Sequence, residues 1–383
     1  MQPTGILETA KATNPLVDLL KFGQSVWLDY IRRDLMTSGE LKRLIDEDGL
    51  RGMTSNPAIF EKAAGSKDYA DFLKSCPADL DAKGRYEALA IRDIQDAADI
   101  LRPVYDSSKR YDGYVSLEVS PYLARDTEGT LEEARRLWKA VNRPNVMIKV
   151  PGTREGIPAF QQLISEGINV NVTLLFSQVV YQKVAEAYVA GLGECAARGG
   201  DVSGIASVAS FFISRIDSLV DSILADKLKT SKDPKEQEQL KGMEGKVAIA
   251  NGKLAYQRYL KIFATDAWKK LAAKGAQVQR VLWASTSTKN PKFSDVMYVE
   301  ELIGKDTVNT IPPATLDAFR DHGHPRASLT EDIPAAEHTM KTLAQLSISI
   351  DEVTDKLTDD GVLLFSEAFD KLLAAVAVAK SAK

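Results

Sequence analysis

Cysteine and histidine are scarce in this chain, and their scarcity excludes several kinds of site. Of 383 residues, two are cysteine and three are histidine. Cys76 and Cys195 lie far apart without CxxC or similar ligand spacing, so neither a disulfide framework nor a zinc site is predicted. All three histidines lie at or after position 322, so a His-based metal centre or a Ser-His-Asp triad would need that one late region. We therefore expect the chemistry to rest on Lys, Asp, Glu, Ser and Thr.

Long apolar runs and nucleotide-binding glycine motifs are also missing. No run of about 18 apolar residues occurs, and the start, MQPTGILETAKATNPL, lacks a basic segment followed by an apolar one. A net charge of −4 gives no electrostatic reason to expect nucleic acid or an anionic membrane as partner. Neither GxGxxG nor a Walker A sequence is present. We expect a soluble cytoplasmic protein, a monomer or homodimer, without metal or cofactor.

Two of the histidines, His322 and His324, lie two residues apart in RDHGHPRAS. Such spacing suggests a metal site, but no third ligand is evident. We expect a solvated loop after the last strand instead.

Short β-rich segments alternate with helical patterns through most of the chain. This alternation is typical of βα units with a parallel sheet. The expected strands cover residues 25–31, 50–56, 113–120, 145–151, 168–176, 205–213, 280–286 and 306–311. Eight strands with intervening helices favour a closed (β/α)8 TIM barrel, of class α/β, over an open doubly wound sheet, for which a glycine-rich turn after the first strand is expected.

Capping residues and glycines mark the helices between these strands. The expected signals are Asn14-Pro15 before the first strand, Ser38 to Gly49, a capping box at Thr130–Glu133, Thr153 to Gly167, and Ser177 to Gly199-Gly200. Residues 227–246 form a charged, solvated run in a helix-rich connection. From Ala327 onward only amphipathic helices are expected. We predict one domain over residues 1–383, with a barrel core at about 25–320 and a C-terminal helical extension at 327–383.

Lys149 lies in an apolar run, NVMIKVPGT, and a buried unpaired ammonium is costly. Side chains of a barrel strand alternate between the interior and the helix layer, and active sites form at the carboxyl ends of the strands. Polar residues recur late in successive strands: Asp29, Asn56, Glu118, Lys149, Asn171 with Thr173, Ser210, and Ser285. Any one could be a hydrogen-bonded strand end. Three charges converging inside one barrel indicate a function.

One reaction class suits a lysine with two carboxylates. A lysine desolvated inside a barrel is partly uncharged, and its free amine can attack a ketone to form a Schiff base. Loss of the carbinolamine oxygen as water needs an acid/base, and cleavage of the neighbouring carbon-carbon bond needs a base for the hydroxyl two carbons away. Glu118 and Asp29 provide the two carboxylates, and no metal is required.

The chain resembles the transaldolases, in particular the larger bacterial type with a long C-terminal extension. The matching segments are GMTSNPAIFEKA (52–63), VSLEVSPYLARDTEGTLEEAR (115–135), MIKVPGTREGI (147–157), INVNVTLLFS (168–177), SFFISRID (210–217) and VNTIPPATLDAF (308–319). They run in order through about residues 25 to 320. The resemblance implies a class I aldolase-type (β/α)8 barrel with its Schiff-base lysine on the fourth strand.

The resemblance also implies roles for individual residues. Lys149 in IKVPGT is the Schiff-base lysine, and Glu118 is the acid/base acting through a water that Thr173 helps to hold. Asp29 is the base at the C4 hydroxyl. The residues implied to bind the hydroxyls of the dihydroxyacetone unit are Asn56, Asn171 and Ser210.

The phosphate site departs from the family pattern in two places. Family members often read SPFVGRI where this chain has SFFISRI, which leaves Arg215 as the phosphate arginine but changes its turn. Where a second phosphate arginine is often found after the seventh strand, this chain reads ASTSTKN. We assign Ser285, Ser287 and Lys289 to that part of the site.

The leading hypothesis is transfer of a dihydroxyacetone unit from sedoheptulose 7-phosphate to glyceraldehyde 3-phosphate, which gives erythrose 4-phosphate and fructose 6-phosphate. This is a reaction of the non-oxidative pentose phosphate pathway. The nearest rival is a fructose-6-phosphate aldolase that releases free dihydroxyacetone. A rival of another class is an inactive barrel that binds sugar phosphates.

Overall fold

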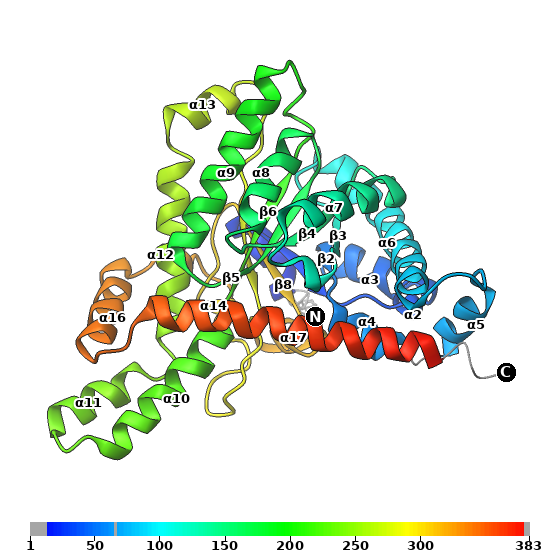
Figure 1. The fold of residues 1–383 in the computed structure, drawn as a ribbon. Helices are drawn as coiled ribbons and strands as arrows, with labels where there is room; N and C mark the ends of the chain where they lie inside the picture. The colour runs from blue at the N-terminus through cyan, green and yellow to red at the C-terminus, as the bar shows by residue number, and fades with distance from the viewer. Residues whose placement is uncertain (1–13, 65–66, 379–383) are drawn as a thin grey trace, which may run out of the picture.

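Eight parallel strands form a closed barrel in the computed structural model, which describes residues 14–64 and 67–378 (Figure 1). Each strand pairs with the next in sequence, and the last pairs with the first. The strands are β1 Gln24–Asp29, β2 Leu50–Thr54, β3 Tyr114–Glu118, β4 Val146–Pro151, β5 Val170–Leu175, β6 Ser207–Phe212, β7 Arg280–Ala284 and β8 Thr307–Ile311. The predicted (β/α)8 barrel is confirmed, and each strand is somewhat shorter than predicted.

Helices fill the connections between the strands. Before and within the first half of the barrel they are α1 Pro15–Asp18, the 3-10 helix η1 Leu19–Phe22, α2 Arg33–Thr37, α3 Glu40–Glu47, α4 Pro57–Ala64, α5 Lys67–Ser75, α6 Ala82–Ser107, η2 Pro121–Leu123, α7 Thr127–Val141 and α8 Gly156–Ser165. The second half and the extension hold α9 Gln178–Ala197, α10 Ser214–Thr230, α11 Pro234–Met243, α12 Val247–Ile262, α13 Asp266–Ala272, α14 Met297–Glu300, α15 Pro313–His322, η3 Ser328–Thr330, α16 Ile333–Gln345 and α17 Ile350–Val378.

Most of the helix signals are confirmed. Asn14 caps α1, Ser177 caps α9, and the Thr153 hydroxyl accepts a hydrogen bond from the first residue of α8 at 3.0 Å. The charged run 227–246 contains the end of α10 and the whole of α11.

Two helix starts were predicted wrongly. Thr130 lies inside α7, because Asp126 caps this helix earlier by accepting a hydrogen bond from the backbone of Gly129. The helix expected at Ser38 begins at Glu40, and a separate short helix, α2, ends just before Ser38. Both errors arise because several residues in a row can cap a helix and only one does so.

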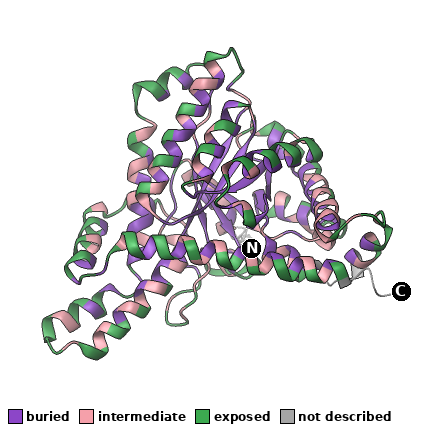
Figure 2. Ribbon diagram, viewed as in Figure 1, coloured by how far each residue is buried: buried purple, intermediate pink, exposed green. Residues whose placement is uncertain are grey.

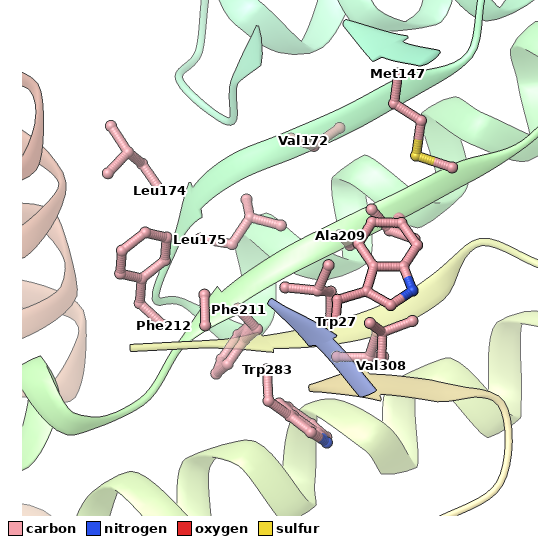
Figure 3. Packing of buried hydrophobic residues seen from close by; sticks show 14 of the residues in the cluster. Trp27, Met147, Val172, Leu174, Leu175, Ala209, Phe211, Phe212, Trp283 and Val308 are labelled. Carbon is pink, nitrogen blue, oxygen red and sulfur yellow. The ribbon is translucent and has the colours of Figure 1, made fainter. Parts of the chain in front are cut away.

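The strands form the centre of the core, and the helices bury one face against them. Figure 2 shows the strands almost wholly buried, whereas the outer faces of the helices are exposed. In Figure 3, Met147, Val172, Ala209 and Trp27 lie among these strands, and Leu174 lies near Phe212 at the edge of the cluster. A parallel sheet covered by helices buries both of its faces, as this barrel does.

The amino-terminal end of the barrel is filled by an aromatic side chain and closed by an ion pair. A Cβ at Gly52 would lie 2.5 Å from the Trp27 indole, so glycine makes room for this ring. Arg280 Nη2 donates to Asp112 Oδ1 at 2.8 Å. Asp112 also accepts hydrogen bonds from Ser25 Oγ at 2.8 Å and from Trp27 Nε1 at 3.3 Å. The interior of the barrel is therefore filled by side chains at this end.

The C-terminal extension is helical, as predicted. Helix α16 packs against α12, and α17 contacts α4, α6, α10 and β5. Figure 1 shows α17, in red, running across one end of the barrel. No helix within residues 14–64 or 67–378 is both long and apolar enough to cross a membrane.

Candidate active site

A cavity of about 730 Å³ opens at the carboxyl ends of the strands. Most of the predicted site residues line it. They are Asp29, Asn56, Lys149, Thr173, Ser210, Arg215, Ser285, Ser287 and Lys289. The size fits a small organic ligand, and the position is that of the active site in TIM barrels.

The register of neighbouring strands brings three predicted residues side by side. Glu118 on β3 pairs with Lys149 on β4, which pairs in turn with Asn171 on β5. Residues at the same level of a parallel sheet point to the same face, which here is the barrel interior. The strand alternation used for the sequence prediction therefore places these three side chains in one layer.

Lys149 is buried and paired. Its Nζ lies 3.2 Å from Glu118 Oε2 and donates to the backbone oxygen of Ser55 at 3.1 Å. The residue is only 4% exposed, and this small fraction faces the cavity. The position lets the amine meet a ligand while the protein holds the rest of the side chain.

Burial gives Glu118 the titration range of an acid/base. It raises the pKa of Glu118 from its ordinary value of 4.5 to about 6, although the neighbouring Lys149 charge acts in the opposite direction. The negative charge of Asp29 adds to the increase. Near neutral pH such a carboxyl can both donate and accept a proton.

Asp29 is the second carboxylate at the cavity. Thr54 Oγ1 donates to Asp29 Oδ1 at 2.7 Å, and the Thr54 and Thr310 hydroxyls lie 2.7 Å apart. Burial raises the pKa of Asp29, and the positive charge of Lys149 is the strongest of the influences that lower it. The Thr54 hydrogen bond fixes the carboxylate at the end of β1, where it borders the cavity.

Polar residues of β5 and β6 form a hydrogen-bonded group beside Lys149. Ser210 Oγ donates to Asn171 Oδ1 at 2.7 Å, and Asn171 Nδ2 donates to Ser116 Oγ at 3.0 Å. Asn171 is fully buried and is absent from the cavity wall, whereas Ser210 lines it. Thr173 Oγ1 is buried and has no hydrogen-bond partner among residues 14–64 and 67–378.

Asn56 lies just beyond β2, where its side chain accepts a hydrogen bond from the backbone of Ile59 at 3.1 Å. It therefore caps the start of α4 and borders the cavity at the same time.

Arg215 and Lys289 supply positive charge on one side of the cavity. Arg215 is the second residue of α10, and its guanidinium lies 5.3 Å from the centre of the Phe212 ring. Burial lowers the pKa of both cations, and the negative charge of Asp29 opposes this effect. Lys289 Nζ donates to Ser287 Oγ at 2.6 Å.

The start of α10, just before Arg215, contacts the loop after β7. The Ser214 and Ser285 hydroxyls lie 2.9 Å apart, and the Ser214 backbone N–H donates to the backbone carbonyl oxygen of Ser285 at 3.0 Å. These contacts tie the start of α10 to the loop that carries Ser287 and Lys289.

The sequence prediction missed the part of the wall that comes from outside the strand ends. Leu364 and Phe365 of α17 line the cavity, as do Arg32 and Lys62. The helical pattern of the C-terminal segment indicated a buried face, but a pattern of this kind does not identify the surface that the face covers.

The histidines lie away from the cavity wall. His322 is the last residue of α15, so the prediction that it lies in a loop was wrong, although both His322 and His324 are exposed as expected. His322 contacts Asp295 and Asp321, at 2.9 Å and 3.0 Å. In the part of the chain that the structure describes, no group of three His, Cys, Asp or Glu residues could hold a metal ion.

Comparisons with known proteins cover the barrel together with the C-terminal helices. A family model described as Transaldolase/Fructose-6-phosphate aldolase matches residues 26–376. A protein named transaldolase from Trichodesmium erythraeum (strain IMS101) is 51% identical over 365 residues, which are 94% of this chain and 96% of that protein. Proteins of the same name from Thiobacillus denitrificans (strain ATCC 25259 / T1) and Frankia alni (strain DSM 45986 / CECT 9034 / ACN14a) are 49% and 45% identical. They align over 94% and 95% of this chain and over 98% and 97% of their own lengths.

Proposed function

Because the chain belongs to the transaldolase/fructose-6-phosphate aldolase family, we propose that it catalyses the transaldolase reaction. In this proposal a dihydroxyacetone unit passes from sedoheptulose 7-phosphate to glyceraldehyde 3-phosphate, and the products are erythrose 4-phosphate and fructose 6-phosphate. The observation that carries the proposal is the buried Lys149, 3.2 Å from Glu118, in a cavity that Asp29 also borders.

Lys149 starts the reaction by passing a proton to Glu118 and attacking the ketose carbonyl as a free amine. The carbinolamine that forms loses its oxygen as water, and Glu118 supplies the proton for this step. The Thr173 hydroxyl, which has no hydrogen-bond partner among the described residues, supports a water that carries this proton between Glu118 and the substrate. The product of this stage is a Schiff base that accepts the electrons of the carbon-carbon bond.

Asp29 then removes the proton from the C4 hydroxyl. The bond between C3 and C4 breaks, the aldose phosphate leaves, and the electron pair stays on the three-carbon unit bound to Lys149. Addition of the acceptor aldehyde reverses these steps. The lysine itself provides the electron sink, so we propose a reaction that uses neither metal nor cofactor.

Binding of the sugar divides between two groups of residues. Asn56 and Ser210 border the cavity and are proposed to bind the hydroxyls of the dihydroxyacetone unit. Asn171 was predicted to do the same, but its full burial favours a role in orienting Ser210 through their 2.7 Å hydrogen bond. The proposed phosphate site consists of Arg215, Ser285, Ser287 and Lys289.

The proposal includes a cellular and physical setting. We propose a cytoplasmic enzyme of sugar-phosphate metabolism, a monomer or homodimer, in which barrel and C-terminal helices form one domain.

An activity assay with and without acceptor tests the proposed function. With sedoheptulose 7-phosphate and glyceraldehyde 3-phosphate we expect erythrose 4-phosphate and fructose 6-phosphate in equal amounts. With fructose 6-phosphate alone we expect much slower release of dihydroxyacetone. Release as fast as transfer would identify a fructose-6-phosphate aldolase, and binding without either activity would identify an inactive barrel.

A further inference from the structure

Helix α17 contributes an apolar cover to the proposed active site. The Phe365 ring centre lies 5.6 Å from Lys149 Nζ, and the side chain is nearly buried, at 8% exposure. Phe365 lines the main cavity and, together with Val362, a small crevice that reaches Glu118. Phe369 lines a second crevice on Glu118.

Val362, Phe365 and Phe369 share one face of α17. Their spacing of three and four residues places them in a row along the helix. The row passes over the Lys149–Glu118 pair, whereas Leu363 is 58% exposed on another face. The cover is therefore a continuous apolar strip rather than one chance contact.

Contacts on both sides of Phe365 hold this strip in place. Towards the C-terminus, Phe369 packs edge-on against Tyr86 and Tyr122, with ring centres 5.4 Å and 5.5 Å apart, and the Tyr122 hydroxyl donates to Asp370. Towards the N-terminus, Asp359 pairs with Arg125.

Strand β5 meets the helix at an irregularity within the strand. Leu174 has a φ of +60°, and the pairing of β5 with β6 shifts at this point. A Cβ at Gly361 would lie 2.8 Å from Leu174 Cδ2. The glycine thus allows α17 to approach the barrel just before Val362.

The chemistry that this cover affects is the fate of the three-carbon intermediate. Under the proposed function, the enamine on Lys149 has two outcomes. In transfer, its C3 carbon forms a bond with the acceptor aldehyde. In release, C3 takes a proton, water adds to the C2 of the resulting imine, and the C2–N bond breaks to give dihydroxyacetone and free Lys149. Both outcomes end with addition of water to C2 and release of Lys149, so they differ in whether C3 takes the aldehyde or a proton. Apolar walls that keep bulk water from a reactive intermediate suppress such a protonation.

We propose that Phe365, supported by Val362 and Phe369, keeps bulk water from the Lys149 intermediate and so sets the ratio of transfer to release. Phe365 is thereby a determinant of reaction specificity and takes no part in proton transfer. The proposal rests on the proposed function and extends it to the C-terminal helix.

The test measures the ratio of dihydroxyacetone released to units transferred at saturating glyceraldehyde 3-phosphate, for Phe365→Ala, Phe365→Leu and the control Leu363→Ala. We expect Phe365→Ala to raise this ratio by about tenfold or more. Phe365→Leu should lie between Phe365→Ala and wild type, and Leu363→Ala should match wild type. The ratio does not depend on the fraction of folded enzyme, so a loss of stability alone leaves it unchanged.

Failure of this inference can be told apart from failure of the proposed function. Borohydride reduction of the wild-type protein with fructose 6-phosphate reports whether the intermediate forms at all. If it forms and the ratio for Phe365→Ala equals that of Leu363→Ala, the cover has no role and the inference is overturned. If no adduct forms in wild type, the proposed function fails first.

Discussion

Each end of the barrel contains a buried ion pair, and the two pairs are built differently. At the amino-terminal end Arg280 and Asp112 lie 2.8 Å apart, and Asp112 has further hydrogen bonds from Ser25 and Trp27. At the carboxyl end Lys149 and Glu118 lie 3.2 Å apart beside a cavity of about 730 Å³. The first pair is surrounded by packed side chains, and the second leaves its lysine accessible to a ligand.

Under the proposed function, this difference gives one end of the barrel a role in stability and the other a role in the reaction. A buried pair whose polar atoms are all satisfied fixes a structure and offers nothing to a substrate. In the second pair, the carboxyl has a pKa near 6 and can transfer a proton, and the amine faces a cavity and can form a covalent bond with a ligand. The following predictions separate the two functions.

The largest effect is expected from Lys149→Arg. A guanidinium keeps the positive charge beside Glu118 but does not form a Schiff base, so transfer activity should fall below detection. The unfolding free energy of this variant, measured by urea denaturation, should change far less than its activity. Retention of activity in this variant would show that the reacting amine lies elsewhere.

Glu118→Gln should reduce kcat about 100- to 10,000-fold, the usual effect of losing a general acid/base. In wild type, activity should fall as the pH drops below about 6, because Glu118 then loses the base form that accepts the proton of Lys149. The residual activity of Glu118→Gln should lack this acid limb. A pH profile of kcat checks both expectations, and an unchanged limb in the variant would assign the titration to another group.

The same carboxyl has a predictable effect on stability. The pKa of Glu118 in the folded protein, about 6, lies above its ordinary value of 4.5, so the folded state binds this proton more readily than the unfolded state. Glu118 should therefore destabilise the fold above pH 6, and this penalty should disappear as the pH falls towards 4.5.

At the other end of the barrel, Arg280→Met should act on stability and spare the chemistry. The substitution leaves Asp112 buried without its partner, which costs about 3–5 kcal/mol of unfolding free energy. The kcat of the folded fraction should remain close to wild type. Denaturant unfolding and active-site titration measure the two quantities, and a large fall in kcat with normal stability would contradict the proposed division.

The smallest effect is expected from Lys289→Met. Under the proposed function Lys289 makes one charged contact to the substrate phosphate. Its loss should raise KM about tenfold, equivalent to roughly 1.5 kcal/mol, with kcat little changed. Lys292→Met is a suitable control, because Lys292 lies in the same segment but is absent from the cavity wall. Equal KM values for the two variants would remove Lys289 from the phosphate site.

The sequence predicted the barrel and most of the cavity wall because both follow from strand periodicity. Alternation along β3, β4 and β5 was enough to place Glu118, Lys149 and Thr173 on the inner face. The same rule failed to distinguish Ser210, which borders the cavity, from Asn171, which lies behind it. Whether a side chain on the inner face reaches the cavity or is covered by its neighbours depends on packing between strands. The periodicity of one strand does not show this.

The contribution of α17 could not be predicted for a different reason. Its apolar spacing shows that one face is buried, but the contact between Phe365 and Lys149 joins segments far apart in sequence. The irregularity of β5 at Leu174, which has a positive φ, also departs from strand alternation. Both features bring the extension to the mouth of the barrel, and both depend on tertiary packing.

The most direct measurement of the central claim is reductive trapping. The protein is incubated with fructose 6-phosphate, reduced with borohydride and digested, and the added mass is located by mass spectrometry. Three lysines line the cavity within the described ranges, namely Lys62, Lys149 and Lys289, so the position of the adduct is decisive. The account predicts a three-carbon adduct on the peptide that contains Lys149. An adduct on Lys62 or Lys289, or none at all, would contradict it.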